Sequence, residues 1–559
     1  MTSGSAPRKV DAVVVGSGAT GGWVAKRLAE AGVSVALLDA GRPLTDEGFR
    51  EHVPAHALRY RGLSRRPLLD SRPKQAEYYA CDEWNASWFV NDLEEPYTTP
   101  AGKSFSWFGR MRVVGGRTTV WGRQSYRFSD ADFQAASTDG VGVDWPLRYA
   151  DLAPYYDLVE KYVGISGQPE GDPLIPDGRF LPPMTMSCAE RMFASRVRDR
   201  FGRLVTIGRA ANLTRPHRGR AACHYCGPCE HGCVTHSYFN SAFTTVADAM
   251  ASGRCTLVTD AMVHQVIVDS DQHRVSGVRY IDRRTRQVRE ITARIVVLCA
   301  QMFESVRVLL NSATRQAPTG LANSSGLLGR FLQVHFTGVG AAAEFPELPG
   351  EPSLGRPRRP NGLFVPRFRN RPGQPAHGKF VRGYGYQGGS SVRFDMGAPG
   401  FGETYKKAVH RGITTMRLQA FGECLPYEDN RCEIDPQTVD AFGIPVLRIH
   451  MTYRENERAM LEDMASSAAG MLEEAGGRNI HTFSEPRETT HEVGCARMGR
   501  DPRTSVLDPF QRTHDVDNLY VMDGSGFPSG GWSNPTLTMM ALAVRSTDHL
   551  LERMRKGEA

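Results

Sequence analysis

The chain has 559 residues, of which 40% are hydrophobic and 23% are charged, the composition of a folded globular protein too long for a single core. The formal net charge of +7 is small for this length, and basic stretches such as Arg65-Arg66 and residues 356–359 occur beside prolines rather than on a helix face, so nucleic-acid binding is not expected. No apolar run reaches the roughly 18 residues of a membrane helix, no signal-peptide core is visible, and 11 cysteines make a poor disulfide framework, so we expect a cytoplasmic protein without a membrane span.

The first elements predicted along the chain form a βαβ unit: a buried strand over residues 11–15, a helix over 21–31 and a second strand over 33–39. Residues 46–104 have weak periodicity, which predicts an irregular covering segment. Further helices are predicted over residues 152–163, 240–250, 303–311, 455–475 and 537–553. Further strands are predicted over residues 255–258, 263–268, 275–281, 295–299, 413–424, 445–451 and 519–522. Loops are predicted over residues 172–190 and 208–222, and a long loop or lid over residues 345–378.

A glycine-rich loop joins the first predicted strand to the first predicted helix. It reads Gly16-Ser17-Gly18-Ala19-Thr20-Gly21, the pattern G-x-G-x-x-G. Its glycines permit a tight turn, the approach of a pyrophosphate to the backbone, and close packing of helix on strand, while the helix N-terminus offers amide hydrogens to the phosphates. Asp39 ends the second strand and can accept hydrogen bonds from ribose hydroxyls. These features predict a dinucleotide site that also includes Ala40 and Arg42, and by themselves they do not separate FAD from NAD.

Four blocks of sequence make the prediction more specific. They are the glycine loop through Gly41, residues 114–122 (Val-Gly-Gly-Arg-Thr-Thr-Val-Trp-Gly), residues 296–312 with 323–326, and residues 491–540. In their order and content the chain resembles the glucose–methanol–choline (GMC) oxidoreductases. The resemblance implies an α/β fold in which a Rossmann-like FAD-binding domain is interleaved with an antiparallel-sheet substrate domain. The FAD-binding domain is then expected at residues 1–45, 105–135, 220–325 and 485–559, and the substrate domain at residues 136–219 and 326–484.

The resemblance also implies which residues hold FAD. Beside the first loop, a second flavin-contacting loop is implied at Gly115, Gly116, Thr118 and Trp121. The adenine is expected near the backbone of Val263, the ribityl and phosphate region near Asp523 and Gly524, and the isoalloxazine ring near Asn534, Pro535 and Thr536. Some relatives attach FAD to a histidine four residues after the Gly-Gly pair of the second loop. This chain has Val120 there, so we expect FAD to be bound without a covalent link.

His491 and Asn534 are the predicted catalytic residues, because the family pairs one histidine with a second His or Asn about 43–45 residues later. Here the two residues are 43 positions apart. A group must take the hydroxyl proton when an alcohol carbon loses a hydride to flavin N5, and an imidazole is suited to this near neutral pH. The amide of Asn534 cannot act as a base, but it can donate a hydrogen bond to the substrate oxygen. Other histidines, among them His335, His410, His481 and His514, are interpreted as structural.

A run of four cysteines follows the pattern C-x2-C-x2-C-x3-C at Cys223, Cys226, Cys229 and Cys233. This spacing is used by bacterial ferredoxin clusters, and it resembles a cysteine-rich insertion in a GMC subgroup that contains sugar and sugar-acid dehydrogenases. An iron–sulfur cluster, a zinc ion, and metal-free thiols or a local disulfide are the open interpretations. In the bacterial motif a proline follows the fourth cysteine, whereas Val234 follows here.

These observations predict an FAD-dependent dehydrogenase or oxidase that acts on a small-molecule alcohol, with a sugar or a sugar-containing compound as the expected substrate. The preference for sugars rests on the cysteine-rich subgroup alone. Two alternatives remain: oxidation of a non-sugar alcohol by the same chemistry, and an FAD-containing electron-transfer subunit. The electron acceptor, which could be oxygen, a dye-like molecule or a protein, is left open.

Overall fold

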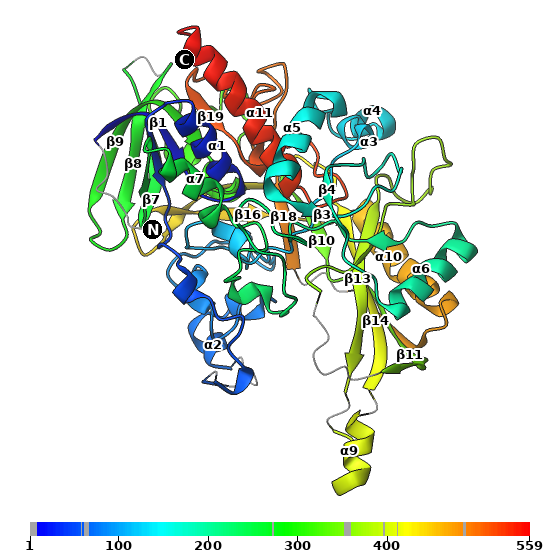
Figure 1. Ribbon diagram of the computed structural model, residues 1–559. Coiled ribbons are helices and arrows are strands. Elements are labelled where there is room, and N and C mark those ends of the chain that lie inside the picture. The colour runs from blue at the N-terminus through cyan, green and yellow to red at the C-terminus, as the bar shows by residue number, and fades with distance from the viewer. Residues whose placement is uncertain are drawn as a thin grey trace.

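The computed structural model describes residues 8–57, 59–60, 66–270, 273–350, 359–394, 397–410, 412–484 and 488–559. The strands gather in two large sheets that lie in different parts of the molecule (Figure 1). Among the described residues, no helix is long and apolar enough to cross a membrane. The α/β fold class predicted from the sequence is confirmed.

The first sheet has seven strands in the order β6-β2-β1-β9-β8-β7, with β19 paired to β9. The strands are β1 (Lys9–Val15), β2 (Val35–Leu38), β6 (Cys255–Val258), β7 (Ala261–Val268), β8 (Val275–Asp282), β9 (Val288–Leu298) and β19 (Leu519–Val521). β1 pairs in parallel with β2 and β9, whereas β8 is antiparallel to both of its neighbours. Helices on a face of this sheet include α1 (Ala19–Glu30), α7 (Thr245–Ala251) and α11 (Thr536–Arg555), and α1 packs against the other two.

The second sheet has eight strands and is antiparallel along its central path, β17-β11-β14-β13-β12-β5; β10 pairs with β14, and β18 pairs with β10. Its strands are β5 (Thr206–Ile207), β10 (Gln333–Thr337), β11 (Gly340–Gly350), β12 (Leu363–Val365), β13 (Tyr384–Arg393), β14 (Gly412–Glu423), β17 (Arg478–Phe483) and β18 (Glu488–Val493). Helix α10 (Glu455–Glu474) packs on β11, β14 and β17, and α6 (Cys188–Phe201) contacts α10 and β13.

Smaller elements complete the fold. The remaining helices are α3 (Asp130–Phe133), α4 (Ala135–Asp139), α5 (Tyr149–Val163), α8 (Met302–Asn311) and α9 (Gly402–His410). Of these, α9 projects beyond the ends of β13 and β14 (Figure 1). Two-stranded sheets form from β3 (Ile165–Ser166) with β4 (Phe180–Leu181) and from β15 (Arg431–Val439) with β16 (Pro445–His450). Between residues 46 and 104 the only helical elements of the described chain are α2 (Arg66–Ser71) and short 3-10 turns.

Two predictions about local structure were wrong. Residues 345–378 were expected to form a long loop or lid, but β11 extends to Gly350 and β12 occupies Leu363–Val365. Residues 351–358 of that stretch lie outside the described residues, as does the basic residue Arg65. Helix α6 begins at Cys188, inside the loop predicted over residues 172–190. The predicted domain limits stay a prediction, although β18, which falls in the 485–559 segment, pairs with β10 of the second sheet.

Candidate active site

A cavity of about 1370 Å³ lies between the carboxyl ends of the first sheet and one face of the second sheet. The first sheet contributes the ends of β1, β2 and β9 through Val15, Leu38 and Cys299. Side chains that line the opposite wall come from β13, β14 and β17. Ligands of open α/β sheets bind at the carboxyl ends of the strands, so the position of this cavity fits a dinucleotide.

The glycine loop has the backbone geometry that its sequence predicts. Gly16 has φ +96°, and a Cβ there would lie 2.4 Å from the carbonyl oxygen of Cys299. A Cβ at Gly21 would lie 1.8 Å from the carbonyl oxygen of Gly16, whereas one at Gly18 would meet nothing within 4 Å. The outer two glycines therefore permit the turn and the helix packing, and Gly18 leaves its backbone open to the cavity.

Asp39 and Asp523 occupy the cavity wall with much of their hydrogen-bonding capacity already used. The Asp39 carboxylate accepts hydrogen bonds from the backbone and hydroxyl of Ser17 and from the Gly41 backbone at 2.7 Å. A carboxylate has about four acceptor sites, so Asp39 retains room for about one ribose hydroxyl. Asp523 accepts from Ser305 and Ser525, and burial raises its pKa above the usual value despite these hydrogen bonds.

Most of the predicted cofactor residues line this cavity. They are Gly16, Gly18, Ala19, Thr20, Asp39, Ala40, Gly116, Thr118, Trp121, Val263, Asp523, Gly524, Asn534, Pro535 and Thr536. Three do not: Gly21 packs against Gly16, Gly115 donates its N–H to the Ser17 hydroxyl, and the exposed Arg42 donates to Ser87. Val120, at the position of the covalent link in some relatives, is a buried part of the wall. The residues present thus fit FAD.

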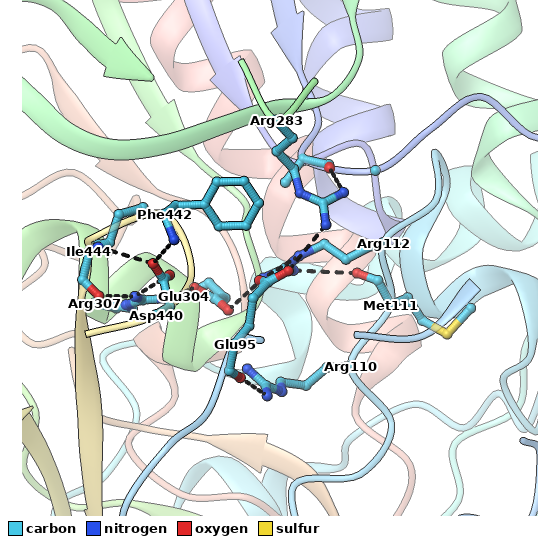
Figure 2. Close-up of polar contacts among 12 residues, drawn as sticks. Glu95, Arg110, Met111, Arg112, Arg283, Glu304, Arg307, Asp440, Phe442 and Ile444 are labelled. Atoms are coloured by element: carbon cyan, nitrogen blue, oxygen red, sulfur yellow. Dashed lines mark hydrogen bonds and ion pairs between the residues drawn. The ribbon is translucent and has the colours of Figure 1, made fainter. Parts of the chain in front are cut away.

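A buried cluster of ion pairs supports the wall near Ala40 (Figure 2). Glu95 is 1% exposed and accepts from Arg112 at 2.6 and 3.1 Å and from Arg283 at 3.2 Å. Arg283 also donates to the carbonyl oxygen of Ala40 at 3.0 Å, and Arg112 bridges to Glu304 at 3.1 Å. Burial raises the pKa of Glu95, but the guanidinium groups of Arg112, Arg283 and Arg110 together outweigh burial, and the pKa lies below its usual value. Since Arg112 and Glu304 both line the cavity, the cluster holds this part of the wall in place.

His491 lies on an irregular part of β18 that turns its side chain toward the cavity. Along β10, Gln333 is opposite Val493 and His335 is opposite Thr490, so one extra residue is inserted in β18. His491 itself has φ +60°, a conformation that is rare for a residue with a side chain. Bulges of this kind redirect side chains and are frequent beside active sites.

A chain of hydrogen bonds joins His491 to three other side chains. Its Nε2 is 3.3 Å from Nδ2 of Asn534, and Oδ1 of Asn534 accepts from Gln387 at 2.6 Å. On the other side of the ring, Nδ1 of His491 is 3.0 Å from Nδ1 of His335. Burial, followed by the nearby imidazole of His335 and the charge of Arg117, lowers the pKa of His491 well below its usual value. The ring is therefore a neutral base at pH 7, and the structure brings the predicted catalytic pair together at the cavity surface.

The second sheet supplies polar cavity residues that the sequence did not point to. Gln387 of β13 and Gln419 of β14 are directly opposite each other, and Arg417 and Phe421 lie two residues to either side of Gln419 on the same face. Thr337 and His481 also line the cavity. His335, interpreted from the sequence as structural, is buried, and its ring contacts that of His491. Only the alternation of polar residues along residues 413–424 could have indicated this wall.

The cysteine run lies next to the cavity wall. Cys229 is buried, the other three cysteines are half-buried, and none of the 11 cysteines forms a disulfide. Among the described residues, the ligand atoms gathered closely enough for a metal are those of His52, His224 and Cys226, rather than the four sulfurs. Zn–S bonds of about 2.3 Å require the sulfurs of a zinc site to lie close together, so the arrangement does not match a four-cysteine zinc site. Arg123 lines the cavity and lies close enough to Cys229 for its charge to act on that thiol.

Comparison with known proteins identifies the class. A family profile described as GMC oxidoreductase matches residues 10–337, and another with the same description matches residues 426–543. The chain therefore belongs to the GMC oxidoreductases, enzymes that bind FAD and act on CH–OH groups. The resemblance found in the sequence is confirmed.

Its relatives include dehydrogenases with different substrates. The chain is 31% identical to 2-methyl-1,2-propanediol dehydrogenase of Mycolicibacterium austroafricanum, over 98% of this chain and 96% of the relative. It is 27% identical to the fructose dehydrogenase large subunit of Gluconobacter japonicus, over 98% of each chain. A solved structure of formate oxidase from Aspergillus oryzae RIB40 covers all of both chains with a TM-score of 0.63 at 16% identity, a likeness of fold alone.

Proposed function

We propose that this protein oxidises an alcohol group of a sugar or sugar-containing compound to a carbonyl, with His491 as the base. The observation that carries the proposal is the pair of cavity-facing atoms, His491 Nε2 and Asn534 Nδ2, which lie 3.3 Å apart. A substrate hydroxyl in the cavity within hydrogen-bond distance of both atoms can donate its hydrogen to the imidazole and accept one from the amide.

Each residue has a separate part in the reaction. FAD held by the glycine loop and the Asp523 region supplies the acceptor for the substrate hydride. His491 takes the hydroxyl proton at Nε2, and Asn534 holds the oxygen in place, since Gln387 fixes the orientation of its amide. The polar wall of Gln387, Gln419 and Thr337 supports a substrate with several hydroxyl groups, because such a surface would be desolvated without compensation by an apolar alcohol.

Anaerobic flavin bleaching against a panel of sugars, glycosides and simple diols tests the proposal. His491→Ala should slow flavin reduction by roughly 10²–10⁴-fold, the usual size of acid–base catalysis. Asn534→Ala should slow it by about 10²-fold, as for the loss of one oxyanion donor. His514→Ala is the matched control, because His514 contacts Ser505 outside the cavity lining. Reduction of the flavin only by a partner protein, with no alcohol active, would favour an electron-transfer subunit instead.

The cysteine run is proposed to hold an iron–sulfur cluster. Its support is the C-x2-C-x2-C-x3-C spacing, together with backbone N–H groups of Tyr225 and Ser237 that point at the sulfurs of Cys223 and Cys233 at 3.4 and 3.3 Å. Protein purified without oxygen should contain iron and acid-labile sulfide at a few atoms per chain. Iron below about a tenth of that stoichiometry would leave the run as metal-free thiols.

A further inference from the structure

His335 lies behind the catalytic histidine, where it does not line the cavity. It is on β10, is 1% exposed, and shares its two ring nitrogens between two partners. Its Nε2 is 2.7 Å from the carbonyl oxygen of Gly531, and its Nδ1 is 3.0 Å from Nδ1 of His491. The mechanism above does not use this residue.

The two contacts determine where the protons are. A carbonyl oxygen only accepts, so Nε2 of His335 must carry hydrogen, and a neutral imidazole has only one N–H. Nδ1 of His335 is then an acceptor, which requires Nδ1 of His491 to be the donor. By the same reasoning Nε2 of His491 has no hydrogen and presents its lone pair to the cavity beside the amide of Asn534.

We propose that His335 is a positioning residue that holds His491 in the tautomer and ring orientation required of the base. This inference rests on the proposed function of His491. In the opposite tautomer, the hydrogen on Nε2 would face the cavity and the lone pair on Nδ1 would face that of His335, so the ring could neither accept the substrate proton nor keep its partner.

The surroundings keep the imidazoles of His335 and His491 neutral. Burial lowers the pKa of His335 to about 4, so it stays an acceptor at Nδ1 at neutral pH. The charged groups beside the two rings are already paired. Arg117 is paired with Glu492 at 2.6 Å on the cavity side, and Glu423, which is opposite His335 on β14, is paired with Arg382 at 3.1 Å. When His491 becomes protonated, its Nδ1–H remains bonded to a lone pair, which stabilises the cation without moving the ring.

Two substitutions at this position separate tautomer control from simple packing. In H335N the amide oxygen can take the place of Nδ1 and accept from His491, whereas in H335Q the longer side chain can take the place of Nε2 and donate to Gly531. We expect H335N to reduce its flavin at least ten times faster than H335Q, which should be slower than the native enzyme by on the order of 10²-fold with a similar KM. Flavin absorbance of each purified variant gives the loaded fraction to which the rates are normalised.

Equal rates for H335N and H335Q, or the reverse order, would overturn the inference. The histidine 15N spectrum of the native flavoprotein adds a test that does not depend on how the variants fold, with H491A used to assign the signals. Hydrogen on Nδ1 of His491 is expected, and hydrogen on Nε2 would overturn the inference. If H491A itself reduced flavin at the native rate, the proposed function would fail first. If H491A lost activity but H335N and H335Q reduced their flavin at equal rates, the proposed function would stand and only the positioning role of His335 would be refuted.

Discussion

Replacing Glu95 by glutamine should destabilise the protein far more than the size of the change suggests. The amide keeps the shape of the side chain but removes the negative charge shared by Arg112 and Arg283 (Figure 2). The Arg112 and Arg283 side chains are only 12% and 20% exposed, so water compensates the guanidinium groups left behind only in part. Breaking a buried ion pair by removing one partner costs about 3–5 kcal/mol. With an unfolding entropy of about 2.1 cal/mol/K per residue over 559 residues, 1 kcal/mol corresponds to about 1 °C, so the apparent melting temperature should fall by roughly 3–5 °C.

The matched control is Glu290→Gln. Glu290 also pairs with an arginine, Arg279, at 2.6 Å, but both side chains are exposed. Surface pairs of this kind are worth about 1 kcal/mol or less. Thermal unfolding should be followed with and without added FAD, since Arg283 holds the Ala40 carbonyl at the cavity wall and E95Q should also weaken FAD binding. If E95Q melted no lower than E290Q, the account of this cluster as a buried support would be refuted.

Three further predictions concern the site. Acid precipitation should release the flavin into the supernatant, because Val120 stands where a covalent link would form; fluorescence that stays with the denatured chain would contradict this. Burial lowers the pKa of His491, so its imidazole is deprotonated throughout the neutral pH range. The flavin-reduction rate should therefore stay constant from about pH 8 to about pH 6 and decline only in more acidic buffer, and a decline centred near the usual histidine pKa of about 6.5 would argue against this. Arg417 lines the cavity over the ring of Phe483 and has no carboxylate partner among the described residues, whereas the cavity residues Arg110, Arg112, Arg117 and Arg123 each have one. Arg417 can therefore pair with a substrate carboxylate, and R417Q should raise the KM for sugar acids by about tenfold or more and leave the KM for neutral sugars unchanged. Equal effects on both classes of substrate would contradict this role in binding a carboxylate.

The elements that the sequence predicted well are those whose signal is local. The unit β1–α1–β2 follows from an apolar run, a glycine loop and an acid within about 30 residues, and each of these has a steric or hydrogen-bonding reason that needs no distant partner. Strand β13 was missed for the opposite reason. Its Gly388 resembles a loop residue, yet a Cβ there would lie 2.2 Å from the carbonyl oxygen of Arg417 on β14, so glycine is required by the close approach of another strand.

Helix α6 shows that some local signals were overlooked. Ser187 and Glu190 form a capping box directly before the helix, a pattern visible in the sequence, but the arginine-rich segment that follows has a weak apolar stripe. His335 carried no such signal. It meets His491 from 156 residues away through the register of β10 and β18, and register between distant strands is set by the whole sheet.

The predicted catalytic pair shows why spacing alone could indicate two residues but not the geometry between them. His491 lies near the end of β18 in the second sheet, and the chain that follows runs beside residues 524–526. There the backbone N–H groups of Gly494, Ala496 and Met498 donate hydrogen bonds to Gly524, Ser525 and Gly526 at 2.9–3.0 Å. This ladder ties the exit from β18 to the segment that leads into α11, whose first turn follows Asn534. The 42 residues between His491 and Asn534 therefore form a loop whose two ends are held together by this ladder, and the ladder rather than either sheet sets the 3.3 Å contact. A change in the intervening residues 500–518 should leave the pair in place, whereas a change that breaks the ladder should separate base from amide without touching either one.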